Sequence, residues 1–242
     1  GLLHALHPGR IDLGLGRAPG TDQLTVHALR RSDDTGDDFP RQLAELIGFL
    51  DGSFPDDHPY RAVEAVPRGP DRPPIWLLGS SGFSARLAGM LGLPFAFAHH
   101  FSAANTLPAL ELYRSAFQPS AVLDRPYTMI GVNAFAADTA AEALRQVRSG
   151  LLGMLYLRRG RPRLVPTPEE AEAYPYTEAE RAFLEGRLAE IIYGEPETVR
   201  HGLDELQRRT GVDELMITAN VHSGAAKLRS YELIAKAYKM TS

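Results

Sequence analysis

The chain has 242 residues, of which 44% are hydrophobic and 23% charged, and its formal net charge is −4. Such a chain is large enough for one sizeable α/β domain or two smaller ones. It has no basic excess of the kind that nucleic-acid binding requires, and no apolar run long enough to cross a bilayer. The absence of cysteine excludes disulfides and thiolate metal sites, and it fits our expectation of a cytoplasmic protein.

The first predicted strand ends beside an arginine. Residues 1–9 are typical of a helix end at a Pro-Gly turn, and residues 10–17 alternate as in a strand. Arg17 then stands at the carboxyl end of this strand, where parallel α/β proteins bind their ligands. Its guanidinium suits a phosphate or a carboxylate. A surface salt bridge is the alternative interpretation.

The next segments carry little chemistry. Residues 23–38 are polar and acid-rich, which indicates a solvated segment rather than a metal site. Helical spacing predicts a helix over 39–50 that ends at Gly52. The proline-rich residues 53–74 predict an irregular excursion or a small hairpin.

Residues 75–98 predict a strand, a tight turn, a helix and a second strand, which together form a βαβ unit. The turn between the first strand and the helix has two glycines, three hydroxyl groups and no acid. Its candidate ligand-binding residues are Gly79, Ser80, Ser81 and Ser84. Free N–H groups at a helix start, flanked by serines, suit an anion such as phosphate. The alternative is that the serines only cap the helix.

Two histidines, His99 and His100, follow the second of these strands. No Asp, Glu or third His stands nearby at ligand spacing, so we predict no metal site. Adjacent residues of a strand point to opposite faces, so only one of the two is expected to enter a central site. Lining a pocket and plain core packing remain the two open interpretations.

The rest of the chain continues the alternation of strands and helices. We expect helices over 105–117, 139–149 and 195–210, and a terminal helix marked by residues 228–238. Strands are expected over 127–135 and 214–218. Residues 150–193 are richer in charge and carry further capping signals, which predicts a helical insertion. About five strands, each followed by a helix, predict a parallel α/β architecture.

Three segments resemble those of the bacterial luciferase-like flavin-dependent monooxygenases. They are HPGRIDLGLGRAPGTD (7–22), GSSGFSARLAGMLGLPFAFAHHF (79–101) and YGEPETVRHGLDELQRRTGVDELMI (193–217). The family fold is a (β/α)₈ TIM barrel with an excursion between strands 7 and 8. The resemblance implies that residues 1–242 form a single barrel domain with strands 4 to 8, and that residues 150–193 are the excursion. The first three βα units, on the order of 100 residues, would then precede Gly1.

The resemblance also implies a function: oxygenation of a small organic substrate by O₂ and reduced FMN, which a separate flavin reductase supplies. The flavin phosphate would be held by Arg17, by the backbone of Pro19, and by the turn that contains Gly79, Ser80, Ser81 and Ser84. Many family members carry an acidic residue where Ser80 stands.

The resemblance leaves the catalytic group unassigned, because the family's histidine near the flavin ring belongs to the portion that would precede Gly1. His99 and His100 are the candidates on the substrate side. A homodimer is expected. A deazaflavin (F420)-dependent oxidoreductase of the same fold and a non-catalytic flavin-binding protein are the alternatives. Residues 17–38 and the insertion are candidate lids that would exclude water.

Overall fold

This computed structural model describes residues 1–18, 23–29, 38–67, 69, 71–161 and 163–240. They divide into two compact units, which are treated separately below. Unit 1 comprises Gly1–Phe97 and Leu107–Thr128, and unit 2 comprises Ala98–Thr106 and Met129–Ser242. The predicted ligand residue Pro19 lies outside the described residues, as does most of the predicted solvated segment after position 29.

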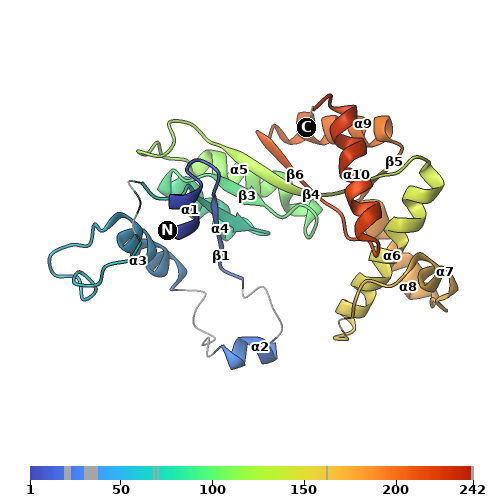
Figure 1. Cartoon of the computed structure of the whole chain (residues 1–242), viewed down its shortest axis with the longest axis horizontal. Coiled ribbons are helices and arrows are strands. Elements are labelled where there is room, and N and C mark those ends of the chain that lie inside the picture. The colour runs from blue at the N-terminus through green and yellow to red at the C-terminus, as the bar shows by residue number, and fades with distance from the viewer. Residues whose placement is uncertain (19–22, 30–37, 68, 70, 162, 241–242) are drawn as a thin grey trace. The chain divides into compact units, whose positions relative to one another are not determined.

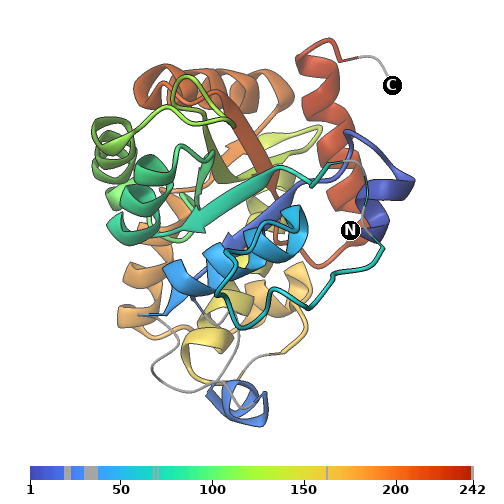
Figure 2. The same cartoon turned by 90° about the vertical axis from the view of Figure 1, so that its left-hand side faces the viewer.

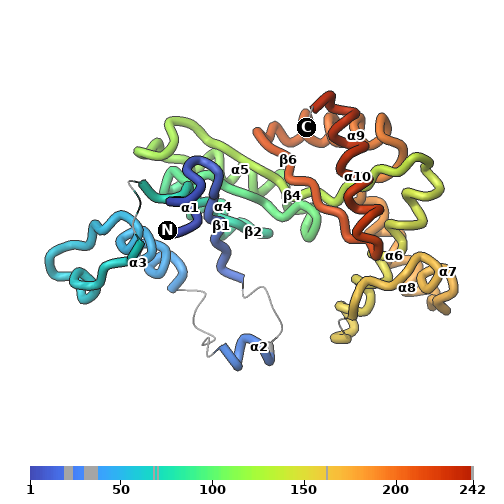
Figure 3. The backbone as a smooth tube through the Cα atoms, viewed as in Figure 1, coloured from blue at the N-terminus to red at the C-terminus, as the bar shows by residue number. Residues whose placement is uncertain are grey.

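Unit 1 is built on three parallel strands (Figure 1). Its elements are α1 (Leu2–Leu6), β1 (Leu13–Gly16), α2 (Gln23–Ala28), α3 (Phe39–Asp51), β2 (Ile75–Gly79), α4 (Gly82–Leu91), β3 (Phe95–Phe97) and all but the first residue of α5 (Thr106–Ala116). Strand β2, labelled in Figure 3, pairs in parallel with both β1 and β3. The register places Leu13 opposite Ile75, and Leu77 opposite Phe95. The predicted βαβ unit is therefore confirmed.

The core of unit 1 lies between this sheet and the helices. Ile75, Leu77 and Phe95 lie on the same face of the sheet and are fully buried. Tyr113 on α5 is also fully buried, and its hydroxyl donates to the Leu93 carbonyl at 3.0 Å. That bond satisfies the one polar group of an otherwise apolar ring, so the tyrosine fits the core without a desolvation penalty.

Unit 2 is organised around a long central strand. Its elements are η2 (a 3₁₀ turn, Ala103–Asn105), β4 (Thr128–Ala136, from its second residue), α6 (Ala140–Arg158), α7 (Pro168–Ala173), α8 (Glu178–Leu188), β5 (Ile192–Gly194), α9 (Pro196–Thr210), β6 (Glu214–Thr218) and α10 (Gly224–Ala237). Both β5 and β6 pair in parallel with β4. Helices α9 and α10, orange and red in Figures 1 and 2, pack against each other.

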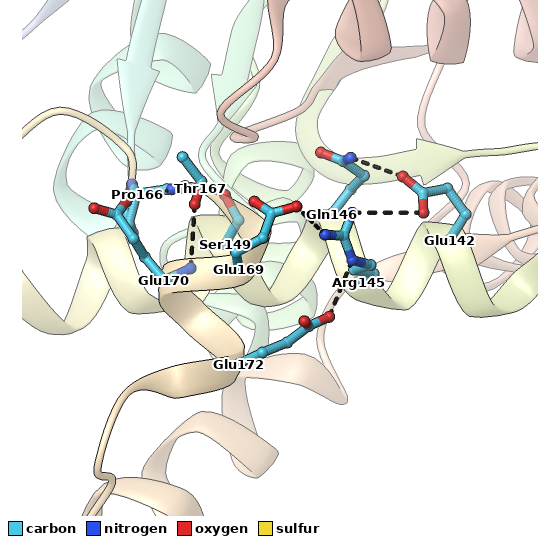
Figure 4. Close-up of polar contacts among 9 residues, drawn as sticks. All are labelled: Glu142, Arg145, Gln146, Ser149, Pro166, Thr167, Glu169, Glu170 and Glu172. Atoms are coloured by element: carbon cyan, nitrogen blue, oxygen red, sulfur yellow. Dashed lines mark hydrogen bonds and ion pairs between the residues drawn. The ribbon is translucent and has the colours of Figure 1, made fainter.

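Polar contacts join α7 to α6 (Figure 4). Arg145 on α6 reaches the carboxylates of Glu169 and Glu172 on α7, and the Ser149 hydroxyl donates to the Pro166 carbonyl at 2.6 Å. Thr167 forms the predicted reciprocal capping box at the start of α7. The buried Ser149 bond is worth more than the exposed ion pairs, because solvent screens the latter.

Three elements differ from the sequence prediction. Helix α6 continues to Arg158, beyond the predicted end near 149, because its later leucines are buried beside α7 and α8. The strand β5 and the helix α2 were not predicted. No described helix has the length and apolarity needed to cross a membrane.

Candidate functional site

The two predicted anion-binding features of unit 1 lie together. The guanidinium carbon of Arg17 lies 4.4 Å from the centroid of the Phe83 ring. Phe83 is the second residue of α4, and Ser81 is the N-cap of that helix. Arg17 is therefore placed beside the first turn of α4, in a cation–π contact that leaves the edge of its fork available. Within the described part of the chain, Arg17 forms no ion pair with a carboxylate.

The serine-rich turn forms the start of α4, and no side chain caps this helix. Ser81 has extended backbone angles and makes no side-chain capping hydrogen bond, and the first turn contains no acidic residue. Ser80 and Ser81 are exposed, whereas Ser84 is buried. A Cβ atom on Gly79 would lie 2.8 Å from the Ser84 Cβ, so glycine permits this close approach. The Ser81 geometry therefore does not support the interpretation that its side chain only caps the helix.

These groups can bind a phosphate by ordinary chemistry. The N-terminal N–H groups of α4 point toward the helix start, where the macrodipole favours negative charge. Exposed hydroxyls and an unpaired guanidinium add further donors at the same place.

A cavity in unit 2 is the second candidate site. Its volume is about 310 Å³. Its wall is made by strand ends, helix α6 and the segment that contains the two histidines. The lining residues are His100, Phe101, Asn133, Ala134, Phe135, Val147, Gly150, Leu151, Met154, Ile191, Thr218, Ala219, Asn220, Val221 and Lys227. An apolar lining with a few polar groups is typical of a small-molecule site.

The structure places one of the two histidines, His100, at the cavity of unit 2. His100 lines the cavity, and its Nδ1 lies 2.9 Å from the Gly131 carbonyl oxygen. A carbonyl can only accept, so Nδ1 carries the proton and Nε2 of neutral His100 remains an acceptor. Both histidines lie beyond the end of β3, so their separation arises from the turn and not from strand alternation.

Helix α8 contacts the segment that contains His100. Arg187 on α8 donates from Nη2 to the His100 carbonyl oxygen at 2.9 Å and also pairs with Glu190. A charged donor to a carbonyl of the cavity wall restricts the backbone on which the imidazole is mounted. Helix α8 is thus tied to the wall of the cavity by a polar contact.

His99 is a core residue. It is 7% exposed, and its Nδ1 lies 2.8 Å from the hydroxyl oxygen of Thr106, which is itself buried. Burial lowers the pKa of His99, and the electrostatic effects of the nearby Arg209 and His100 side chains lower it further. The imidazole is therefore held neutral and structural.

This burial gives a pH-dependent stability. Below about pH 6.5, the ordinary pKa of histidine, His99 is protonated in the unfolded chain. In the folded chain its lowered pKa keeps it neutral to a lower pH. The free energy of unfolding therefore does not depend on His99 above about pH 6.5, and it falls as the pH drops below this value toward the lowered pKa of the folded chain. We expect a steeper loss of unfolding free energy between about pH 7 and 5 in the wild type than in His99→Gln, measured by urea unfolding. The exposed His201→Gln change is the control, and identical slopes for all three proteins would contradict the assignment.

Sequence reasoning missed three residues of these sites: Phe83, Arg187 and Lys227. Phe83 stood inside the predicted turn, and its position one residue from a glycine-serine helix start was the available signal. No local signal distinguished Arg187 or Lys227 from solvated charges. The carbonyl that Arg187 binds, and most of the cavity that Lys227 lines, come from residues distant in the sequence.

Comparisons with known proteins agree with this fold. The model of the family described as luciferase-like monooxygenase matches residues 1–214. The protein YvbT of Bacillus subtilis (strain 168) is 49% identical over 239 residues, which cover 99% of this chain and 70% of YvbT. A luciferase-like monooxygenase of Escherichia coli (strain K12) is 44% identical over 235 residues, which cover 96% of this chain and 69% of that protein. The crystal structure of apo-MsnO8 is similar with a TM-score of 0.82 and 36% identity, over 99% of this chain and 71% of that one.

The parallel α/β fold and these relatives define the class of protein: an oxidoreductase with the fold of the luciferase-like TIM barrels. The chain belongs to the luciferase-like monooxygenase family.

Proposed function

We propose that this protein is a monooxygenase that uses reduced FMN and O₂ to oxygenate a small organic substrate. The observation that carries the proposal is the position of Arg17 beside the start of α4, where the Ser81 side chain makes no capping bond. A phosphate is the group that this combination of donors suits best. FMN carries such a phosphate.

Several residues of unit 1 would each contribute to the binding of FMN. Arg17 would pair with the phosphate, while the exposed hydroxyls of Ser80 and Ser81 and the N–H groups of α4 would donate to its oxygens. Ser84 and Gly79 would shape the turn through their close packing. The backbone of Pro19 is proposed as a further contact on the family resemblance alone. The flavin supplies the oxygen chemistry when bound, and the protein binds and orients it.

We infer that the substrate occupies the cavity of unit 2. Its apolar wall would exclude water from the reaction. His100 would offer Nε2 as a proton acceptor, held in this tautomer by the Gly131 carbonyl and on a backbone fixed by Arg187. We propose no catalytic role for His99, because it is buried against Thr106.

The cofactor has one alternative within the same fold. A 3,6-diketocamphane monooxygenase component in complex with FMN and an F420-dependent secondary alcohol dehydrogenase both share this fold, at 21% and 14% identity and TM-scores of 0.61 and 0.64. The phosphate site of unit 1 suits either cofactor. We prefer FMN because two relatives at 44% and 33% identity are named as monooxygenases. The neighbour in complex with FMN is also a monooxygenase, whereas the F420-dependent neighbour is a dehydrogenase.

We further propose a single barrel domain over residues 1–242, with residues 150–193 inserted between its last two strands. A separate flavin reductase, a homodimer and a cytoplasmic location complete the proposal.

The test combines binding and turnover. The protein is mixed with FMN or F420, and the retained cofactor is identified by its absorbance and by mass spectrometry. O₂ uptake is then measured with NADH, a flavin reductase and candidate substrates. Retention of FMN and substrate-dependent O₂ uptake are expected. Retention of F420 alone would favour the deazaflavin alternative. FMN retention without substrate-dependent O₂ uptake, above the background of the reductase and free flavin, would favour a non-catalytic flavin-binding protein.

A further inference from the structure

Among the described residues that line the cavity of unit 2, one carries a permanent charge. The lining residues that the structure describes include Lys227 and no Asp or Glu. Phe101, Phe135 and Met154 are among the apolar lining residues, and the amides of Asn133 and Asn220 are neutral. A cation without a counter-charge in such a wall favours an anionic ligand, because attraction between charges strengthens when water is excluded.

Lys227 stands where a cation lowers the stability of its own helix. It is the fourth residue of α10, whose N-cap is Ser223. The helix macrodipole places partial positive charge at this end, so a lysine here is repelled and an acidic residue would be favoured. The first turn of α10 contains no acidic residue that could compensate. The ammonium of Lys227 therefore adds its charge to a helix end that already carries partial positive charge.

No protein group in the described part of the chain neutralises this lysine. Lys227 is half-buried and has no ion pair among the described residues. The Tyr231 ring centroid lies 6.0 Å from its Nζ, at the outer limit of a cation–π contact. The ammonium therefore keeps its capacity for a strong charge-assisted hydrogen bond.

We propose that the cavity of unit 2 binds an organic carboxylate with an apolar body, and that Lys227 is the residue that selects the carboxylate. This inference rests on the proposed function for one point, that the ligand of the cavity is the substrate. The carboxylate pairs with Nζ of Lys227, and the apolar body packs against Phe101, Phe135 and Met154. A single lysine suits a carboxylate better than a dianionic phosphate, for which proteins usually assemble several donors.

The test compares two ligands that differ in charge and little else. Hexanoate and hexanamide have the same chain, and only hexanoate is charged at pH 7. Their dissociation constants for the full chain are measured by ligand-observed NMR at low ionic strength, without flavin. We expect the wild type to bind hexanoate about tenfold more tightly than hexanamide, the preference typical of one charge-assisted bond.

Three variants locate the preference. Lys227→Met should abolish it without weakening hexanamide binding, and Lys227→Arg should keep most of it. Lys236→Met is the matched control: it removes the same charge from an exposed position of the same helix, and the preference should stay. Near-UV circular dichroism checks that each variant is folded.

The outcomes separate this inference from the proposed function. Absence of a preference in the wild type, or a preference that survives in Lys227→Met, would overturn the carboxylate site even if FMN binds. A preference that depends on Lys227 in a protein that retains no flavin would overturn the proposed function and leave the carboxylate site standing. Equal loss in Lys227→Met and Lys236→Met would assign the effect to net charge and overturn the role of Lys227.

Discussion

Replacing Arg17 by alanine is expected to weaken FMN binding by about 1.5–3 kcal/mol, or roughly ten- to hundredfold. The reason is the loss of a charge-assisted bond to the phosphate from a guanidinium that stacks on Phe83 and has no described carboxylate partner. Riboflavin has no phosphate, so its affinity should change little. The measurement is a titration of both flavins by fluorescence quenching.

Two further variants sharpen this result. Arg17→Lys keeps the charge but loses the planar fork and its stacking on Phe83, so it should lie between wild type and alanine. Arg10→Ala removes an exposed arginine from the opposite end of β1 and should leave both affinities unchanged. An unchanged FMN affinity in Arg17→Ala, or an equal loss for riboflavin, would remove Arg17 from the phosphate site.

The second large effect concerns the packing that shapes the cavity of unit 2. Gly150 on α6 lies against the backbone carbonyl of Asn220, and a Cβ at this position would overlap that oxygen. A backbone group cannot rotate away, so the loop or the helix must shift. We expect Gly150→Ala to lower the free energy of unfolding by about 2–3 kcal/mol, as overpacking of a filled core does. Thermal and urea unfolding measure this change.

A second helical glycine supplies the control. Gly186 on α8 has open space where a Cβ would be added. Gly186→Ala should therefore be neutral or stabilise by up to about 1 kcal/mol, the helix propensity difference. If Gly150→Ala and Gly186→Ala changed the free energy of unfolding equally, close packing at Gly150 would not be the cause of the loss. Because Gly150 and Asn220 both line the cavity, Gly150→Ala should also weaken hexanoate binding.

Local signals in the sequence located most elements of the fold. The strand predicted over 214–218 is β6 with the same bounds, and helix α9 begins at Pro196 and ends before Gly211 as expected. The Thr167 and Thr177 capping boxes both form. These signals depend on neighbours within a few residues, so the chain carries them before it folds.

The sequence also predicted the main parts of the candidate phosphate site. A guanidinium after one strand and a hydroxyl-rich turn after another predicted an anion site, because parallel strands carry their ligands at the carboxyl end. The structure brings Arg17 to the helix that follows Ser81, and it adds the Phe83 ring beneath the guanidinium. Binding of FMN at this place stays a prediction.

The sequence by itself determined the parallel α/β class, the family and the two segments that suit a phosphate. Tertiary structure decided what depends on distant partners: the short strand β5, which exists by pairing with β4, and the extra turns of α6, whose leucines are buried. It also decided which histidine and which lysine line a cavity. The physical reason is that burial, cavity shape and uncompensated charge are properties of segments brought together, and no local pattern encodes them.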